Sequence, residues 1–174
     1  MQDLEVRVGE EPRIEVHQYA TIVVVVTVAA ALILQAFLPV HFHWAKMLDL
    51  PLLVTLYFAL SRRNPSSGLI LGMIIGLFQD SLSHTDLGLY GIAKTLVGYF
   101  ASSLGSRIEV DHPVSRFFLT IAFCLFHNGV VIVIERLLLG KHEHYFTLPL
   151  LLGALVNAAL AVFLFAFLDL LRKR

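Results

Sequence analysis

Long apolar blocks are the feature of this sequence that most constrains its fold. Six stretches with few charged residues follow one another along a chain of 174 residues. They are residues 20–38, 44–60, 67–82, 87–104, 114–138 and 147–171. A block of about 17–25 mostly apolar residues has the length of a helix that crosses about 30 Å of hydrocarbon. We therefore expect an all-α membrane protein with six transmembrane helices.

The composition agrees with this expectation. The chain is 57% hydrophobic and 15% charged, whereas soluble domains average about 45–50% apolar and about 25% charged residues. The polar residues 1–19 precede the first block and contain more acidic than basic side chains, which is a poor start for a signal peptide. We expect a cytoplasmic tail at 1–19, a membrane domain at 20–171 and a basic cytoplasmic end at 172–174.

The distribution of Lys and Arg indicates how the chain is oriented. With six spans, nine of these side chains fall on the side of the two termini and three on the opposite side, and Lys94 lies inside a span. The rule that basic loops stay inside places both termini in the cytoplasm. The formal net charge of zero gives no sign of a nucleic-acid partner, and we expect the lipid bilayer as the surroundings instead.

The N-terminal tail contains two alternating segments. LEVRV at 4–8 and RIEVH at 13–17 flank GEEP, a pattern typical of a β-hairpin. Two strands alone are only marginally stable in water. A flexible tail, a hairpin held by a cytoplasmic partner and an interfacial helix all remain open.

Glycine recurs at every fourth position of the third block, at Gly68, Gly72 and Gly76. Small residues at this spacing let two membrane helices approach closely. The fourth block has a matching stripe, formed by Gly91, Thr95, Gly98 and Ser102. We expect the two stripes to pack together, and the alternative is that the glycine groove receives the helix of a partner protein.

Three of the charged residues within the expected spans stand out: Asp49, Asp80 and Lys94. Charges in a membrane helix usually face protein or water rather than lipid. Asp80 and Lys94 lie on consecutive helices that are joined by a short connection, so we expect them to form an ion pair. The alternative is that Asp80 reaches water at the membrane surface.

Further polar side chains lie near the middle of the last two spans, at His127, Asn128 and Asn157. Such groups commonly form hydrogen bonds between helices. A path for a substrate or a proton is the alternative.

On the outward side, HFH at 41–43 and HEH at 142–144 are compatible with zinc, but we expect solvated histidines and no metal.

No catalytic motif is present. The sequence lacks HExxH, GxSxG and the lysine loop of nucleotide-binding proteins. Cys124 is the single cysteine, and we expect it to behave as a small buried apolar residue. The chain is therefore expected to have no enzymatic activity and no cofactor.

The stretch from Asp49 to Tyr99 resembles the bacterial rod-shape-determining protein family MreD. The resemblance is carried by three segments: DLPLLVTLYFAL at 49–60, GLILGMIIGLFQDSLS at 68–83 and LGLYGIAKTLVGYFASSLGSR at 87–107. One departure is Pro51, since the proline of this motif commonly precedes the aspartate. The second half of the chain is similar to the family only in its hydropathy.

This resemblance implies a non-enzymatic scaffold in the bacterial cytoplasmic membrane, within the complex that elongates the cell wall. The partners it implies are the bitopic protein MreC, the glycosyltransferase RodA, a class-B penicillin-binding protein and the filament protein MreB. The implied fold is similar to the substrate-binding subunits of energy-coupling-factor transporters. The alternative function is therefore a small-molecule-binding subunit of a vitamin-type transporter. Its outward-open pocket would be lined by Asp80, Lys94, His127, Asn128 or Asn157.

Overall fold

The computed structural model describes residues 21–83, 86–108, 112–138, 140 and 148–171. The expectations for the N-terminal tail, for the basic C-terminal end and for the HEH segment fall outside these residues. The described part contains six α-helices and one short 3₁₀ helix, η1. Their bounds are α1 Thr21–His41, η1 His43–Met47, α2 Leu50–Arg62, α3 Pro65–Ser83, α4 Leu89–Gly105, α5 Pro113–Leu138 and α6 Leu148–Leu170.

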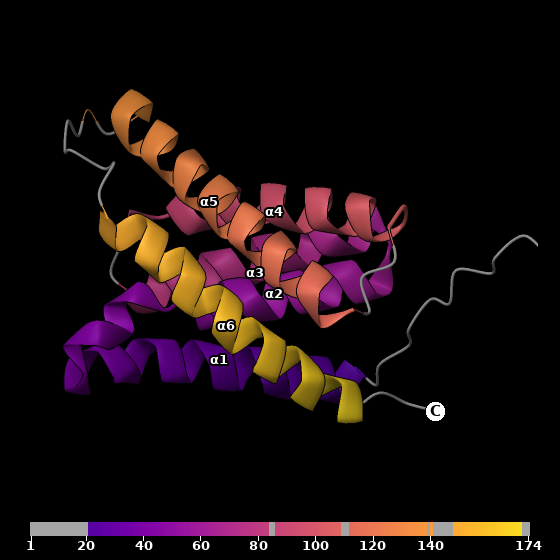
Figure 1. Cartoon of the computed structure of the whole chain (residues 1–174). Helices are drawn as coiled ribbons and strands as arrows, with labels where there is room; N and C mark the ends of the chain where they lie inside the picture. Colours follow the sequence, from indigo (N-terminus) through magenta and orange to yellow (C-terminus); the bar gives the residue numbers. More distant parts are fainter. Residues whose placement is uncertain (1–20, 84–85, 109–111, 139, 141–147, 172–174) are drawn as a thin grey trace, which may run out of the picture.

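Five segments of the described chain are long and apolar enough to cross a membrane. They are Thr21–His41, His43–Arg62, Pro65–Ser83, Pro113–Leu137 and Leu148–Leu170. The expected fourth span is α4, which has 17 residues and is not among the five. The start of α1 and the end of α6 lie at the same end of the bundle (Figure 1). The chain is thus an all-α, multi-pass membrane protein.

The bounds of two expected spans, the second and the first, differ from those of the observed helices. The second is interrupted, because η1 ends at Met47 and α2 begins only at Leu50. Asp49 is the N-cap of α2: its Oδ1 accepts a hydrogen bond from the backbone N–H of Leu52 at 3.0 Å. The first span was expected to end at residue 38, just before Pro39, but α1 continues to His41 with that proline inside it. Because proline has no N–H, the carbonyl oxygen of Gln35, four residues earlier, loses its usual helical partner at this point.

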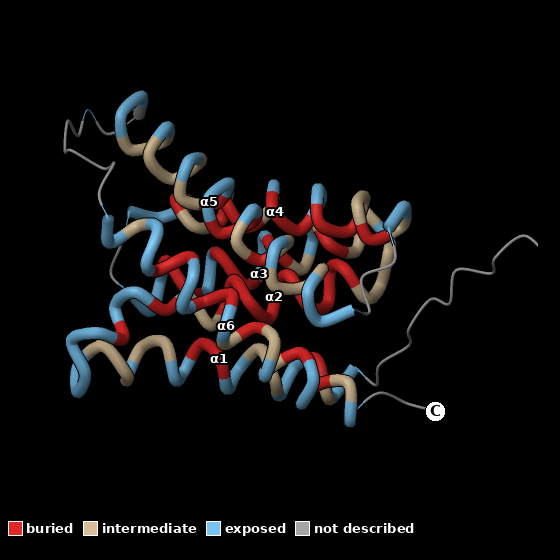
Figure 2. The backbone as a smooth tube through the Cα atoms, in the orientation of Figure 1, coloured by how far each residue is buried: buried red, intermediate tan, exposed pale blue. Residues whose placement is uncertain are grey.

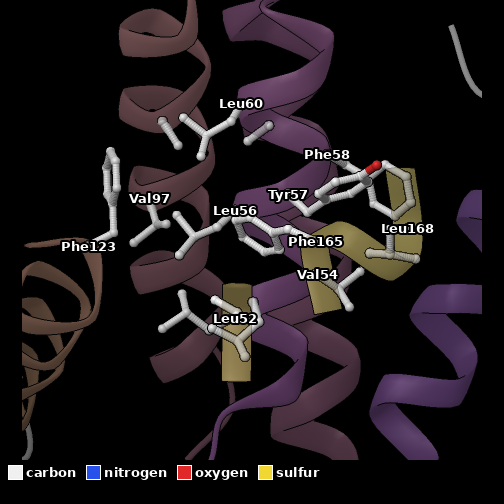
Figure 3. Packing of buried hydrophobic residues seen from close by; sticks show 14 of the residues in the cluster. Leu52, Val54, Leu56, Tyr57, Phe58, Leu60, Val97, Phe123, Phe165 and Leu168 are labelled. Atoms are coloured by element: carbon white, nitrogen blue, oxygen red, sulfur yellow. The ribbon is translucent and has the colours of Figure 1, made fainter. Parts of the chain in front are cut away.

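Helix α2 is the centre of the bundle. Every residue from Pro51 to Leu60 is buried, as expected for a helix that is apolar on all sides. Figure 2 shows the buried stretches gathered in the middle of the bundle and exposed ones along the outer surface. In Figure 3, Leu56 of α2 lies among side chains of three other helices, labelled Val97, Phe123 and Phe165.

The outer surface of the bundle is apolar. Phe118 of α5 and Phe163 of α6 are 64% and 75% exposed. In water such a surface would be costly, but in a bilayer it is the surface that faces the lipid chains. The fold therefore buries its polar groups inside and presents apolar groups outside.

Candidate functional site

Helices α3 and α4 are in close backbone contact along the glycine stripe. A Cβ atom added to Gly72 would overlap the carbonyl group of Lys94, and one added to Gly76 would overlap the backbone of Tyr90 and Gly91. At the other end of the stripe, a Cβ on Gly68 would overlap the hydroxyl of Ser102. The glycine face is thus occupied by α4, which leaves no room on it for the helix of a partner protein.

The other residues of the α4 stripe lie in the interface between α3 and α4 or next to it. A Cβ on Gly98 would overlap the carbonyl group of Gly68. The Thr95 hydroxyl donates a hydrogen bond to the carbonyl oxygen of Gly91 within its own helix, at 2.6 Å. Small size at these positions lets the two helices approach, and the threonine hydroxyl is satisfied locally.

Asp80 fixes the start of α4. Its Oδ2 accepts hydrogen bonds from the N–H groups of Gly88 and Gly91, both at 3.0 Å, and its Oδ1 accepts from Tyr90 at 2.9 Å. The first N–H groups of a helix have no partner within it, and a carboxylate is favoured at this end by the helix dipole. Gly88, the N-cap residue, has φ of 94°, a conformation that glycine adopts readily. Asp80 is therefore a cap supplied by the preceding helix.

The charged partner of Lys94 is Asp49. Lys94 Nζ lies 2.6 Å from Asp49 Oδ2, and the lysine side chain is fully buried. The same Nζ lies 3.3 Å from Nε2 of His127 and 5.1 Å from the centre of the Tyr90 ring. Because the ammonium group has only donors, Nε2 of His127 acts as an acceptor and its ring proton belongs on Nδ1.

The expected ion pair between Asp80 and Lys94 was therefore assigned to the wrong carboxylate. The short connection does bring α3 and α4 together, but Asp80 is taken up by three backbone N–H groups at the start of α4. The Lys94 side chain points toward α2 and binds Asp49, the last residue before α2 begins. Two charges that share a helical hairpin need not share a face of it.

The break between η1 and α2 is held by side-chain amides from α1 and α6. Asn157 accepts a hydrogen bond from the N–H of Asp49 at 2.9 Å and donates to the carbonyl oxygen of Met47 at 2.7 Å. Gln35 accepts from the N–H of Leu50 and donates to the carbonyl oxygen of Leu48, both at 2.9 Å. Irregular backbone at membrane depth is tolerated only where protein groups satisfy it. These two amides provide that satisfaction.

A polar cavity of about 470 Å³ adjoins this break. Residues from all seven helical segments line it. Its polar side chains include Gln35, Lys46, Asp49, Gln79, His127, Asn128 and Asn157. This volume lies within the range of about 300–1,000 Å³ that is typical of small-molecule sites. Of the polar residues singled out in the sequence, Asp49, His127, Asn128 and Asn157 line the cavity. Asp80 of α3 is not among the lining residues and instead caps the start of α4.

A second polar cluster lies at the opposite end of the bundle. Arg116 Nη1 lies 2.6 Å from Asp169 Oδ2, and the Tyr57 hydroxyl donates to Oδ1 of the same carboxylate at 2.9 Å. This cluster joins the start of α5, the end of α6 and the end of α2. Asp169 lies near the end of α6, and the sequence analysis did not single it out, although a carboxylate in an apolar block is a visible signal.

An apolar groove runs between α1 and α3 on the outer surface. It has a volume of about 900 Å³ and is lined by Val25, Val28 and Ile33 of α1 and by Ile70, Ile74, Phe78 and Leu82 of α3, among others. Polar side chains border one end only, at Arg62, Asn64, Ser66 and Ser67. The groove is separate from the glycine stripe, whose face is covered by α4.

Sequence reasoning missed the two glutamines. Gln35 stands alone in an otherwise uncharged span, and Gln79 precedes the more conspicuous Asp80. An uncharged amide in a membrane helix is the signal that could have identified both.

Within the described residues, no group of three or more His, Cys, Asp or Glu side chains is placed to hold a metal ion, and Cys124 is buried.

The fold and the site define a class: a multi-pass helical membrane protein with a buried polar centre and an apolar outer surface. Comparison with protein families makes this assignment more specific. The family model of the rod shape-determining protein MreD matches residues 16–171, so the chain belongs to this family. No curated protein and no solved structure matched it.

Proposed function

We propose that this protein is a non-enzymatic scaffold of the complex that elongates the cell wall, located in the cytoplasmic membrane of a rod-shaped bacterium. The observation that carries the proposal is the match to the MreD family over nearly the whole chain. In this role the protein maintains rod shape by binding MreC. RodA, a class-B penicillin-binding protein and MreB are further members of the same assembly.

The surface that we assign to MreC is the groove between α1 and α3. From Ser66 to Leu82 it follows α3 for about 24 Å at 1.5 Å per residue, which is most of the hydrocarbon thickness. A bitopic protein crosses the membrane as one helix, and a groove of this length matches one. Arg62 and Asn64 at one end offer a cation and an amide to an acidic or polar residue at the end of the partner's helix.

The proposed orientation has six spans with both termini in the cytoplasm. It follows from the excess of Lys and Arg on the side of the termini, and it counts α4 as a crossing helix. In this orientation the polar end of the groove is cytoplasmic. The break after η1 and the cavity then lie toward the outer side of the membrane.

A second function, a small-molecule-binding subunit of a vitamin-type transporter, is favoured by one observation, the polar cavity beside Asp49 and His127. A purely structural bundle has no need of such a space. The family match outweighs it, because the family is named for cell shape.

The scaffold role is tested by cross-linking in the native membrane. Ile74 lines the groove and is 42% exposed, whereas Phe163 lies on α6 and is 75% exposed. An Ile74→Cys variant should form a disulfide with a cysteine in the transmembrane helix of MreC. The Phe163→Cys variant is the matched lipid-facing control and should not. Equal cross-linking by the two variants, or none from either, would remove the groove as the MreC surface.

A further inference from the structure

The cavity beside the η1–α2 break contains an acceptor that nothing in the described chain satisfies. Gln79 is 5% exposed, lines the cavity, and its buried Oε1 has no hydrogen-bond partner within the described residues. A buried polar atom left without a partner costs about 1–3 kcal/mol. A group that donates a hydrogen bond to Gln79 from within the cavity would remove this cost.

Two of the polar side chains around the cavity are already engaged. Asn157 makes its hydrogen bonds to Met47, Asp49 and Gly153, and Asp49 holds Lys94 and the N–H of Leu52. Lys46 is exposed in η1 and brings an ammonium group to the lining.

Among the described residues that line the cavity or contact its lining, the fixed charges are not balanced. Asp49 and Lys94 neutralise one another, and His127 accepts a hydrogen bond from Lys94 through Nε2, so its ring is uncharged. The positive charge of Lys46 remains. An occupant that complements this set has hydrogen-bond donors at the Gln79 end and a negative group at the Lys46 end.

We propose that the cavity binds an anionic, hydroxyl-bearing ligand of the glycerol-phosphate type, with hydroxyls toward Gln79 and the phosphate toward Lys46. The same chemistry has two sources in a bacterial cell: the membrane-bound headgroup of phosphatidylglycerol and soluble glycerol phosphate. This ligand site goes beyond the scaffold role, and it is tested on the purified protein without reference to cell shape.

The test measures binding to the full chain in nanodiscs. One arm uses phosphatidylcholine discs with added glycerol 3-phosphate, and the other adds phosphatidylglycerol to the discs. Calorimetry gives the affinity of the soluble ligand, and the unfolding temperature reports both ligands. Trp44, the only tryptophan of the chain, lies in η1 close to Lys46 and provides a fluorescence signal. Saturable binding in either arm supports the proposal and identifies the source.

Three variants bear on the site itself. Gln79→Leu should weaken binding about tenfold or more through loss of the acceptor, yet raise the unfolding temperature of the ligand-free protein by removing an unsatisfied atom. Lys46→Gln should weaken binding and leave that temperature unchanged. Gly153→Leu should fill the cavity, since a Cβ there is 3.5 Å from its nearest neighbour, the carbonyl oxygen of Met47.

The matched control is Gly129→Leu. Gly129 lies on α5 beside Asn128, and a Cβ at this position has no neighbour within 4 Å. This variant should bind like the parent. The proposal is overturned if neither ligand binds saturably, or if Gln79→Leu, Lys46→Gln and Gly153→Leu all bind as tightly as the parent.

Discussion

Lys94 of α4 and Asp49 at the start of α2 form an ion pair of 2.6 Å in the interior of the bundle. The lysine is fully buried and the aspartate side chain is 18% exposed. Removing two charges from water is costly, and their attraction compensates only with good geometry and further hydrogen bonds. Asp49 also caps α2 and Lys94 also contacts His127, so this pair joins three helices at one point.

The first prediction concerns this pair. Lys94→Met should cost about 3–5 kcal/mol of unfolding free energy, because it leaves the largely buried carboxylate of Asp49 without its cationic partner. Combining it with Asp49→Asn should recover part of the loss, since the amide oxygen can still cap α2 through Leu52. A double-mutant cycle on unfolding in detergent measures the coupling. Losses that simply add would show that the two side chains do not stabilise one another.

Asp80 should behave differently, as a helix cap. Asp80→Ala removes the acceptor of three N–H groups and should destabilise the start of α4, with faster hydrogen exchange at Tyr90 and Gly91. Asp80→Asn keeps one acceptor oxygen and should lie between the parent and the alanine variant. The coupling of Asp80 with Lys94 should be smaller than that of Asp49 with Lys94. A larger coupling would restore the ion pair that the sequence suggested.

The third prediction compares two glycines. Gly72→Ala should lower the unfolding temperature although alanine favours helix, because its Cβ would overlap the carbonyl group of Lys94. Gly129→Ala should gain up to about 1 kcal/mol from helix propensity, since no atom lies within 4 Å of its Cβ. If Gly72→Ala is as stable as the parent or more stable, α3 and α4 are not in backbone contact at this position.

The orientation is tested by labelling with an impermeant thiol reagent in intact cells. A cysteine at Leu87, which is 80% exposed, should react from the outside, and one at Ser66 should react only after the membrane is permeabilised. The native Cys124 is 2% exposed and should contribute little background. Labelling of Ser66→Cys in intact cells would reverse the proposed topology.

Hydropathy located most of the helices, although the second expected span corresponds to η1 and α2 together. The expected third and fourth spans, 67–82 and 87–104, differ from α3 and α4 by at most two residues at each end. This works because a membrane helix satisfies its own backbone, so length and apolarity are sufficient signals. The break at Leu48 and Asp49 was not predicted, because its stability depends on amides from distant parts of the chain.

The partners of the polar residues were harder to predict. Proximity in sequence suggested Asp80 for Lys94, but the choice depends on which face of α4 meets which helix. Gln35 and Asn157 reach the same break from opposite ends of the chain, and no local pattern links them. The cavity is likewise a property of packing among several helices, so periodicity could not reveal it.

The claim that this protein maintains rod shape through the α1–α3 groove is tested most directly by cell width in a strain depleted of it. The parent protein and Phe163→Trp, a lipid-facing control, should restore rods of normal width. Ile74→Trp should obstruct the groove and leave wide, rounded cells, although the protein reaches the membrane in equal amount. Depleted cells that keep their normal rod shape would contradict the claim, and full restoration by Ile74→Trp would contradict the role of the groove.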